Sequence, residues 1–434
     1  MTATAPFMSL LSKIVDNRGR TCPTAESGLP LIATNCVKNS TLYPVFEKVR
    51  YVDQHTYSTW FRGHPLPGDL IFVCKGSPGQ VCVTPDPVNF CIAQDMVAVR
   101  ADPAKVYPPY LFAALRSDEM QSAIVNMHVG TLIPHFKKGD FDKLEIPLPD
   151  EATQRFTGDM YLSLTEKIEL NQRLNETLKG MAQAIFRDWF VDFGPTRRKA
   201  AGEADPVAIM GGLTPDPARA AELAALFPAA FGNDGLPAGW RERPLDTIAD
   251  FLNGLALQKF PAKVGEPDLP VIKIAELRNG LSERTNRAAR TLPAKYIIKD
   301  GDFIFSWSGS LMAKVWALGE GALNQHLFKV SSDEFPQWFY GQWVHHHMPE
   351  FQLIAASKAT TMGHIQRGHL ASATTVCPQQ GAIEVMSSVI QPLWDRMIHN
   401  ELESRTLAET RDYLLPRLMS RAARVEALGT EERR

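Results

Sequence analysis

The sequence predicts a mixed α+β fold in which one unit, an α/β domain followed by a long helix, occurs twice. An apolar stripe at helical spacing runs along residues 153–193, and a matching stripe lies 229 residues later. Before each stripe, short apolar segments alternate with turn residues such as Pro67-Gly68 and Asp300-Gly301. That alternation is typical of strands joined by tight turns. A chain of 434 residues is long enough for two such units.

The first stripe has the pattern of a coiled-coil seam, because its members recur every three or four residues and so share one side of a helix. Asn171 and Asn175 interrupt it, and Gly194-Pro195 ends it. The second stripe has an asparagine, Asn400, at the same third place. We therefore expect the two helices to pack as an antiparallel coiled coil. The seam positions are Leu164, Ile168, Leu178, Ile185 and Trp189, then Leu393, Met397, Leu407, Leu414 and Leu418.

The segments before the helices also repeat. Leu29–Ala33 in the first half corresponds to Leu269–Lys273 in the second, and Pro67–Phe72 corresponds to Asp300–Phe305. These matches predict a pseudo-two-fold tandem repeat. The Ala-, Gly- and Pro-rich stretch between the halves reads as a linker with one short helix, and one further helix is expected at Pro108–Asn126. The predicted division is 1–150, first domain; 151–194, first long helix; 195–235, linker; 236–380, second domain; 381–426, second long helix.

Composition favours a folded soluble protein with 44% hydrophobic and 22% charged residues. No run of eighteen apolar residues occurs, so no membrane span is expected. The first residues lack the pattern of a secretion signal, and six scattered cysteines suit free thiols in a reducing cytoplasm. Residues 1–150 carry 14 basic against 14 acidic residues, and 236–380 carry 15 against 13. Contacts with nucleic acid would therefore need local patches or a basic partner.

Patterns that could carry catalysis or a metal are weak. Tyr107-Pro108-Pro109-Tyr110 resembles an adenine methyltransferase loop, but its first residue is a poor acceptor for an amino group, and no glycine-rich cofactor loop precedes it. His345-His346-His347 has no Cys, Asp or Glu partner at ligand spacing. Glu266, Asp268 and Lys273 have a spacing that a nuclease could use, but such triples are common by chance. We expect no catalytic residues, no metal and no cofactor in this chain.

Polar residues suited to binding occur at corresponding places in both halves. They follow the buried strands and fill one late loop in each half. Ser, Thr and Lys can hold phosphates, whereas Gln and Arg can read base edges. In the first half the candidates are Lys75, Ser77, Gln80, Thr131, His135, Lys137 and Lys138; in the second they are Ser306, Ser308, Ser310, Lys314, Thr360, Thr361, His364, Gln366 and Arg367.

With these repeats in place, the chain resembles the specificity (S) subunits of type I restriction-modification enzymes along nearly its whole length. The residues that carry the resemblance are Met181–Phe193, Leu226-Phe227-Pro228, Leu236–Trp240, Ile390–Leu393, Asn400–Glu403 and Leu414–Leu418. The second helix has Arg417-Leu418-Met419 where the first has Asp188-Trp189-Phe190, so the two helix ends need not be equivalent.

The resemblance implies that each domain is a target-recognition domain for one half of a bipartite double-stranded DNA site. It also implies that the helices space these domains and dock two methyltransferase (modification) subunits, which bind S-adenosylmethionine. A restriction (translocase/nuclease) subunit would join the full enzyme. Residues implied in docking or in the coiled coil are the seam positions together with Phe186, Phe190 and Phe193. Two alternatives stay open: a diverged DNA methyltransferase or nuclease, and a coiled-coil assembly protein without a DNA role.

Overall fold

The computed structural model describes residues 3–17, 19, 21–127, 134–357, 363–379 and 381–419. They form two compact units, one from Met1–Leu170 with Thr406–Arg434 and the other from Asn171–Arg405. Two long helices, α4 (Glu151–Phe190) and α12 (Ala382–Met419), each contribute to both units. No helix within the described ranges is long and apolar enough to cross a membrane.

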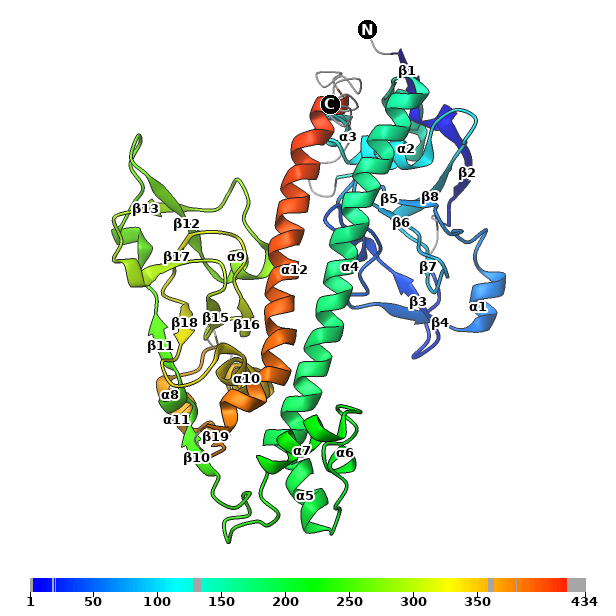
Figure 1. Cartoon of the computed structure of the whole chain (residues 1–434). Coiled ribbons are helices and arrows are strands. Elements are labelled where there is room, and N and C mark those ends of the chain that lie inside the picture. The colour runs from blue at the N-terminus through cyan, green and yellow to red at the C-terminus, as the bar shows by residue number, and fades with distance from the viewer. Residues whose placement is uncertain are drawn as a thin grey trace, which may run out of the picture. The chain divides into compact units, whose positions relative to one another are not determined.

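The first unit is built on a four-stranded antiparallel sheet with strand order β2-β8-β5-β6 (Figure 1). A three-stranded sheet of order β4-β3-β7 and a β1–β9 pair complete it. The strands are β1 (Ala3–Pro6), β2 (Leu11–Val15), β3 (Leu29–Ile32), β4 (Arg50–Val52), β5 (Leu70–Val73), β6 (Val81–Val83), β7 (Cys91–Ile92), β8 (Met96–Ala101) and β9 (Glu145–Leu148), and the helices before α4 are α1 (Gln54–Thr59), α2 (Pro108–Arg116) and α3 (Asp118–Met127).

The second unit repeats this topology. Its four-stranded sheet has the order β11-β18-β15-β16, and its second sheet, β13-β12-β17-β14, carries one extra strand. Its strands are β10 (Arg241–Pro244), β11 (Asp250–Asn253), β12 (Asp268–Ile272), β13 (Arg287–Ala289), β14 (Ile297–Ile298), β15 (Phe303–Ser306), β16 (Met312–Val315), β17 (Gly321–Leu323), β18 (Leu327–Ser331) and β19 (Thr374–Cys377). Its helices are α5 (Gly194–Ala200), α6 (Pro206–Ile209), α7 (Pro217–Ala225), α8 (Leu245–Ile248), α9 (Ile274–Asn279), α10 (Gln337–Ser357) and α11 (Arg367–Ser372). The predicted α+β tandem repeat is confirmed.

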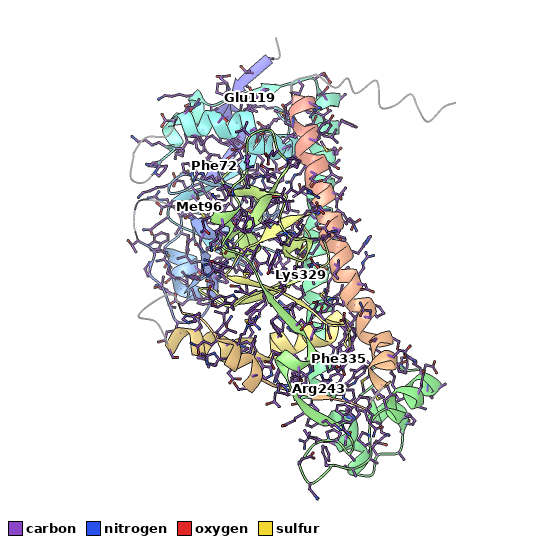
Figure 2. The ribbon with its side chains drawn as sticks, turned by 90° about the vertical axis from the view of Figure 1, so that its left-hand side faces the viewer. Phe72, Met96, Glu119, Arg243, Lys329 and Phe335 are labelled. Carbon is purple, nitrogen blue, oxygen red and sulfur yellow. The ribbon has the colours of Figure 1, made fainter. Side chains whose placement is uncertain are left out.

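The four-stranded sheet of the first unit is apolar on both faces. Successive side chains of a strand point to opposite faces, and all four residues of β5 are buried. Phe72 packs into one hydrophobic cluster with Val97, while Val73 and Met96 belong to another cluster. Figure 2 labels Phe72 and Met96, one from each cluster. Burial on both faces explains why these strands read as continuous apolar runs in the sequence.

One predicted helix is divided in the structure. Instead of a single helix at Pro108–Asn126, α2 ends at Arg116 and α3 begins at Asp118. Ser117 lies between them with an extended backbone, and its hydroxyl accepts a hydrogen bond from the amide of Met120. A serine in this position caps the start of a helix, so it competes with continuation of the preceding one.

The stretch between the two halves is folded rather than a plain linker. It contains α5 and α6 as well as the predicted short helix, α7. Ile209, Leu223 and Phe227 are buried in the main hydrophobic cluster of the second unit. The sequence did not reveal this packing role, because the few large apolar residues of this Ala-rich stretch are widely spaced.

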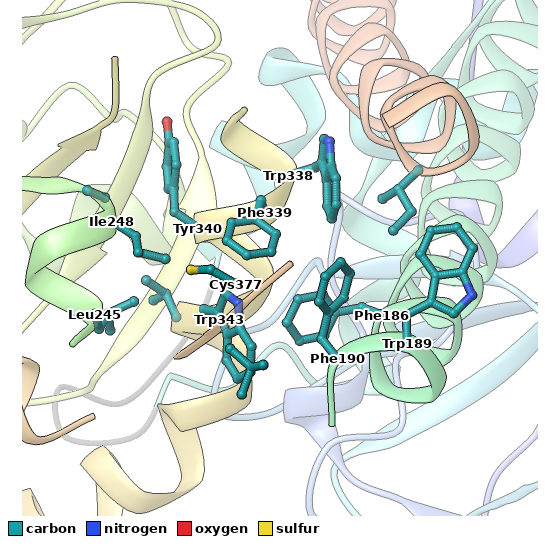
Figure 3. Close-up of a cluster of buried hydrophobic side chains, with 14 of the residues drawn as sticks. Phe186, Trp189, Phe190, Leu245, Ile248, Trp338, Phe339, Tyr340, Trp343 and Cys377 are labelled. Atoms are coloured by element: carbon teal, nitrogen blue, oxygen red, sulfur yellow. The ribbon is translucent and has the colours of Figure 1, made fainter. Parts of the chain in front are cut away.

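The aromatic end of α4 lies inside the same cluster (Figure 3). The ring centroid of Phe186 lies 5.0 Å from that of Trp343 on α10, and Phe190 lies 5.3 Å from Phe339. Trp189 packs 5.6 Å from Phe227. All three side chains of α4 are at most 3% exposed, so their burial within this unit needs no partner protein.

Within the second unit, α4 and α12 run antiparallel. The side-chain amide of Asn171 donates to Glu403 at 2.8 Å, and that of Asn175 donates to the carbonyl of Met397 at 3.1 Å. Moving forward along α4 therefore means moving backward along α12. In the first unit, the Arg411 guanidinium lies 5.4 Å from the Tyr161 ring. The seam positions Ile168, Leu178 and Leu418 are buried, and Leu164, Ile185, Leu393, Met397, Leu407 and Leu414 are half-buried.

Replacing Trp189 by Ala should lower the free energy of unfolding of the second unit by about 3–5 kcal/mol, because it removes a wholly buried ring from a packed cluster. Calorimetric unfolding of the full chain measures this. Met181→Ala is the matched control on the same helix, since Met181 is 48% exposed. Equal effects of the two substitutions would contradict the assignment of Trp189 to the core.

Candidate nucleic-acid interface

Three loops meet at one end of the four-stranded sheet of the first unit. They follow β5, precede β8 and precede the short helix that begins at Lys138. The amides of Cys74 and Lys75 donate to the carbonyl of Asp95, and Lys75 forms an isolated bridge with His135. The loops are therefore held together by backbone hydrogen bonds, which leaves their side chains to define a surface.

That surface carries lysines interleaved with carboxylates. The Lys75 ammonium lies 3.8 Å from Asp95, and the Lys138 ammonium lies 3.2 Å from Asp16. Lys137 is exposed beside them. Together with His135 these side chains line one open pocket. The structure thus brings together four predicted residues, Lys75, His135, Lys137 and Lys138. Exposed ammonium groups on a loop surface are suited to phosphate contacts.

Two other predicted residues of the first unit lie elsewhere. Ser77 is exposed in the turn after β5. The amide oxygen of Gln80 accepts from the backbone N–H of Asn39 at 2.8 Å, while the Asn39 side chain accepts from Val81. Gln80 therefore holds two backbone segments together, a structural role that its sequence position did not reveal. Thr131 lies outside the described residues.

The second unit builds the same loop arrangement with different side chains. Ser308 forms an isolated bridge with His364, as Lys75 does with His135, and the amide of Ile365 donates to the carbonyl of Trp307. The Ser308 hydroxyl lies 3.0 Å from Nδ1 of His326. The Trp307 indole N–H donates to Asn253 at 3.1 Å. Here an indole, imidazoles and amides replace the lysines and carboxylates.

The predicted residues of the second unit separate into buried and exposed ones. Ser306 is wholly buried, and its hydroxyl donates to the carbonyls of Ser308 and Ser310, so it cannot meet a ligand on the surface. Ser308 is 3% exposed and Ser310 is exposed. Lys314 lies on β16 and lines a different cavity. Thr360 and Thr361 lie outside the described residues.

Gln366 and Arg367 are exposed at the start of α11. The backbone N–H of Gln366 donates to Nδ1 of His369 at 2.9 Å, which caps the helix. The Arg367 guanidinium lies 3.5 Å from the Phe251 carbonyl, a distance too long for a strong hydrogen bond. Both side chains are therefore placed to reach an external ligand, next to the His364 loop.

Sequence reasoning missed the carboxylates of Asp16 and Asp95 and the group formed by Trp307, Asn253 and His326. A signal for two of them existed. Asn324-Gln325-His326 aligns with Ala93-Gln94-Asp95 in the repeat. The two segments directly precede the equivalent strands β18 and β8. This match points to Asp95 and His326 but gives no signal for Asp16, Asn253 or Trp307.

The weak catalytic patterns have structural roles. The Tyr107 hydroxyl bonds Asp159 at 2.6 Å, and the buried Tyr110 donates to the Pro147 carbonyl. Asp268 pairs with Arg287 at 2.6 Å instead of joining a nuclease-like group. Burial lowers the pKa of His345 to about 4. Across the described residues, no group of three or more His, Cys, Asp or Glu side chains could hold a metal ion.

Comparisons with known proteins identify relatives of this chain. Residues 29–180 match a family model described as the type I restriction modification DNA specificity domain. The HindI specificity subunit of Haemophilus influenzae is 25% identical over 395 residues, covering 81% of this chain and 86% of that protein. The MjaIX specificity subunit of Methanocaldococcus jannaschii is 21% identical over 336 residues, covering 74% and 71%.

A solved structure shares the fold. The crystal structure of the type I restriction-modification S subunit from M. genitalium aligns over 96% of each chain with a TM-score of 0.53 and 14% identity. The resemblance to specificity subunits seen in the sequence is confirmed by these matches. Neither alternative, a diverged methyltransferase or nuclease or an assembly protein without a DNA role, receives support from them.

Proposed function

We propose that this chain, a relative of the specificity subunits of type I restriction-modification enzymes, recognises the DNA target of such an enzyme and catalyses no reaction itself. The observation that carries this proposal is the duplicated loop cluster at the same end of two equivalent sheets. Rigid sheets that present variable polar loops are a common way to build a recognition surface.

Each loop cluster would read one half of a bipartite double-stranded DNA target. In the first unit, Lys75, Lys137 and Lys138 would contact phosphates, which positions a protein on DNA without reading its sequence. In the second unit, Gln366 and Arg367 would contact base edges, since their side chains match the donor and acceptor patterns of adenine and guanine. Because the two clusters differ in chemistry, the two half-targets would differ in sequence.

The helices α4 and α12 would dock two methyltransferase subunits. Large apolar side chains are exposed on both helices: Leu170 and Met181 on α4, and Tyr413 on α12. Exposed apolar side chains on a helix are candidates for a protein interface. The aromatic residues Phe186, Trp189 and Phe190 are buried within the chain, so docking would use their neighbours instead. S-adenosylmethionine would bind to the docked methyltransferase subunit, and a restriction subunit would complete the enzyme.

The division into 1–150, 151–194, 195–235, 236–380 and 381–426 would then be functional: two recognition domains, two docking helices and a connecting segment. Each domain has its own four-stranded sheet and its own loop cluster. This independence makes a modular specificity the expected behaviour.

Exchanging residues 1–150 for the matching domain of a relative should change one half of the recognised sequence and leave the other half unchanged. Methylome sequencing of cells that carry the exchanged chain with its methyltransferase subunit measures this. A change in both halves at once would show that the domains do not read DNA independently.

Replacing Lys137 by Ala should weaken binding to all DNA sequences alike and reduce the dependence of log K on log salt by about one, because one phosphate contact is lost. Lys105→Ala is the control, since Lys105 follows β8 at the end of the sheet opposite to the loop cluster. DNA binding by the assembled complex is measured over a salt series. An unchanged slope for Lys137→Ala, or the same loss for both variants, would remove Lys137 from the interface.

Replacing Arg367 by Ala should cost about 1–3 kcal/mol of binding to the correct target and relax the preference at a single base position. The measurement is competition between targets that differ at one position. A uniform loss across all targets would instead make Arg367 a phosphate contact.

A further inference from the structure

The second unit contains a partly open cavity that the proposed DNA recognition does not use. It has a volume of about 220 Å³ and lies between α4, α10, α12 and the β15–β16 hairpin. Its apolar wall includes Phe303 and Trp394, whose ring centroids lie 6.1 Å apart. The Trp394 indole N–H donates to Gln337 at 2.9 Å, which fixes the orientation of that ring. The cavity therefore has a preformed aromatic surface.

Two polar side chains of α10 line this cavity and have no hydrogen-bond partner among the described residues. Gln342 is only 2% exposed, and His345 follows it by three positions, so both lie on one face of the helix. Neither side chain is among the buried polar atoms that lack a partner, so their polar atoms face the open space of the cavity. There they can form hydrogen bonds with a bound molecule that has matching donors and acceptors.

The protonation state of His345 limits which hydrogen-bonding groups a ligand of this cavity can carry. Burial, with a smaller contribution from the nearby Lys179, lowers the pKa of His345 to about 4. Its ring is then neutral near pH 7, with one nitrogen as donor and the other as acceptor. A glutamine amide likewise offers one donor and one acceptor group, and it can pair in two places with the edge of an adenine ring.

The rim of the cavity carries charge. Lys179 and Lys314 line it, and neither forms an ion pair within the described part of the chain. Glu176 and Glu401 also line it, and the Glu401 carboxylate accepts from the Asn175 amide at 3.3 Å. Ammonium groups would attract an anionic substituent, while carboxylates can accept hydrogen bonds from hydroxyl groups.

We propose that this cavity binds a small planar nitrogen heterocycle that carries an anionic group, the chemistry of a purine nucleoside monophosphate. The ring lies against Phe303 and Trp394, Gln342 and His345 pair with its edge, and Lys179 and Lys314 face the anionic group. The volume lies below the range of roughly 300–1,000 Å³ typical of drug-sized ligands, so one ring system fits inside and the anionic group stays at the rim.

Such a ligand would couple the helix pair to the second domain, because its contacts come from α4, α12, α10 and β16 together. A molecule that binds only the folded state stabilises that state. This inference is independent of the proposed DNA recognition, since none of the loop residues at His364, Gln366 or Arg367 lines the cavity.

Titration calorimetry of the full chain with adenosine monophosphate, adenine and inorganic phosphate tests the proposal. We expect saturable one-to-one binding of adenosine monophosphate, weaker binding of adenine, and no binding of phosphate alone. Gln342→Leu should weaken binding of both ring compounds at least tenfold, because the shape of the side chain is retained while its amide is lost. Lys179→Ala should weaken the binding of adenosine monophosphate and leave the binding of adenine unchanged.

His346→Gln is the matched control, since His346 is exposed on the same helix and does not line the cavity. If Gln342→Leu fails to fold, Lys314→Ala on the rim replaces it as the variant expected to weaken nucleotide binding. The proposal is overturned if neither ring compound binds at millimolar concentration, if phosphate alone binds as well as the nucleotide, or if binding survives all three cavity variants. Loss of nucleotide binding in Lys137→Ala would place the site in the DNA-contacting loops and would equally overturn it.

Discussion

The burial of one helix end organises the second unit. Phe186, Trp189 and Phe190 lie in the last turns of α4. Phe186 and Phe190 pack against aromatic residues of α10, and Trp189 packs against Phe227. Burying large aromatic side chains is among the strongest contributions that a single element can make to a core. Since the helix that follows the first domain ends in the core of the second unit, neither half of the sequence folds as a closed module.

The same constraint explains the connecting segment. Once Trp189 lies in the core, its exposed side would meet water unless another element covered it. Phe227 provides that cover, and Trp240 packs in turn against Phe227 and Phe190. Helices α5 to α7 carry the chain from the end of α4 to Phe227. A segment with the composition of a linker therefore becomes a part of the fold.

Polar contacts between α4 and α12 fix how the two helices are aligned along their length. Asn171 and Asn400 are wholly buried, and the Asn400 amide donates to the side chain of Asn175 at 2.8 Å. A shift of one helix along the other would leave these amides without partners in an apolar seam, which is costly. Buried asparagines in coiled coils fix register at some loss of stability. Here they would keep the two helices at one axial alignment.

The sequence by itself determined the repeat, one inner strand of each four-stranded sheet (β5 and β15) and the antiparallel pair of long helices, because each depends on local periodicity or on matches between the halves. It also named Lys75, His135, Lys137 and Lys138 as candidates, but in two separate loops, which the structure brings together. Only the tertiary structure decided which polar side chains face solvent. Ser306 and Gln80 look like ligands in the sequence, yet Ser306 donates to backbone carbonyls in the interior and the half-buried Gln80 accepts from a backbone N–H. The meeting of Gln342 and His345 at one cavity was likewise beyond sequence reasoning, because the cavity walls come from four elements far apart along the chain.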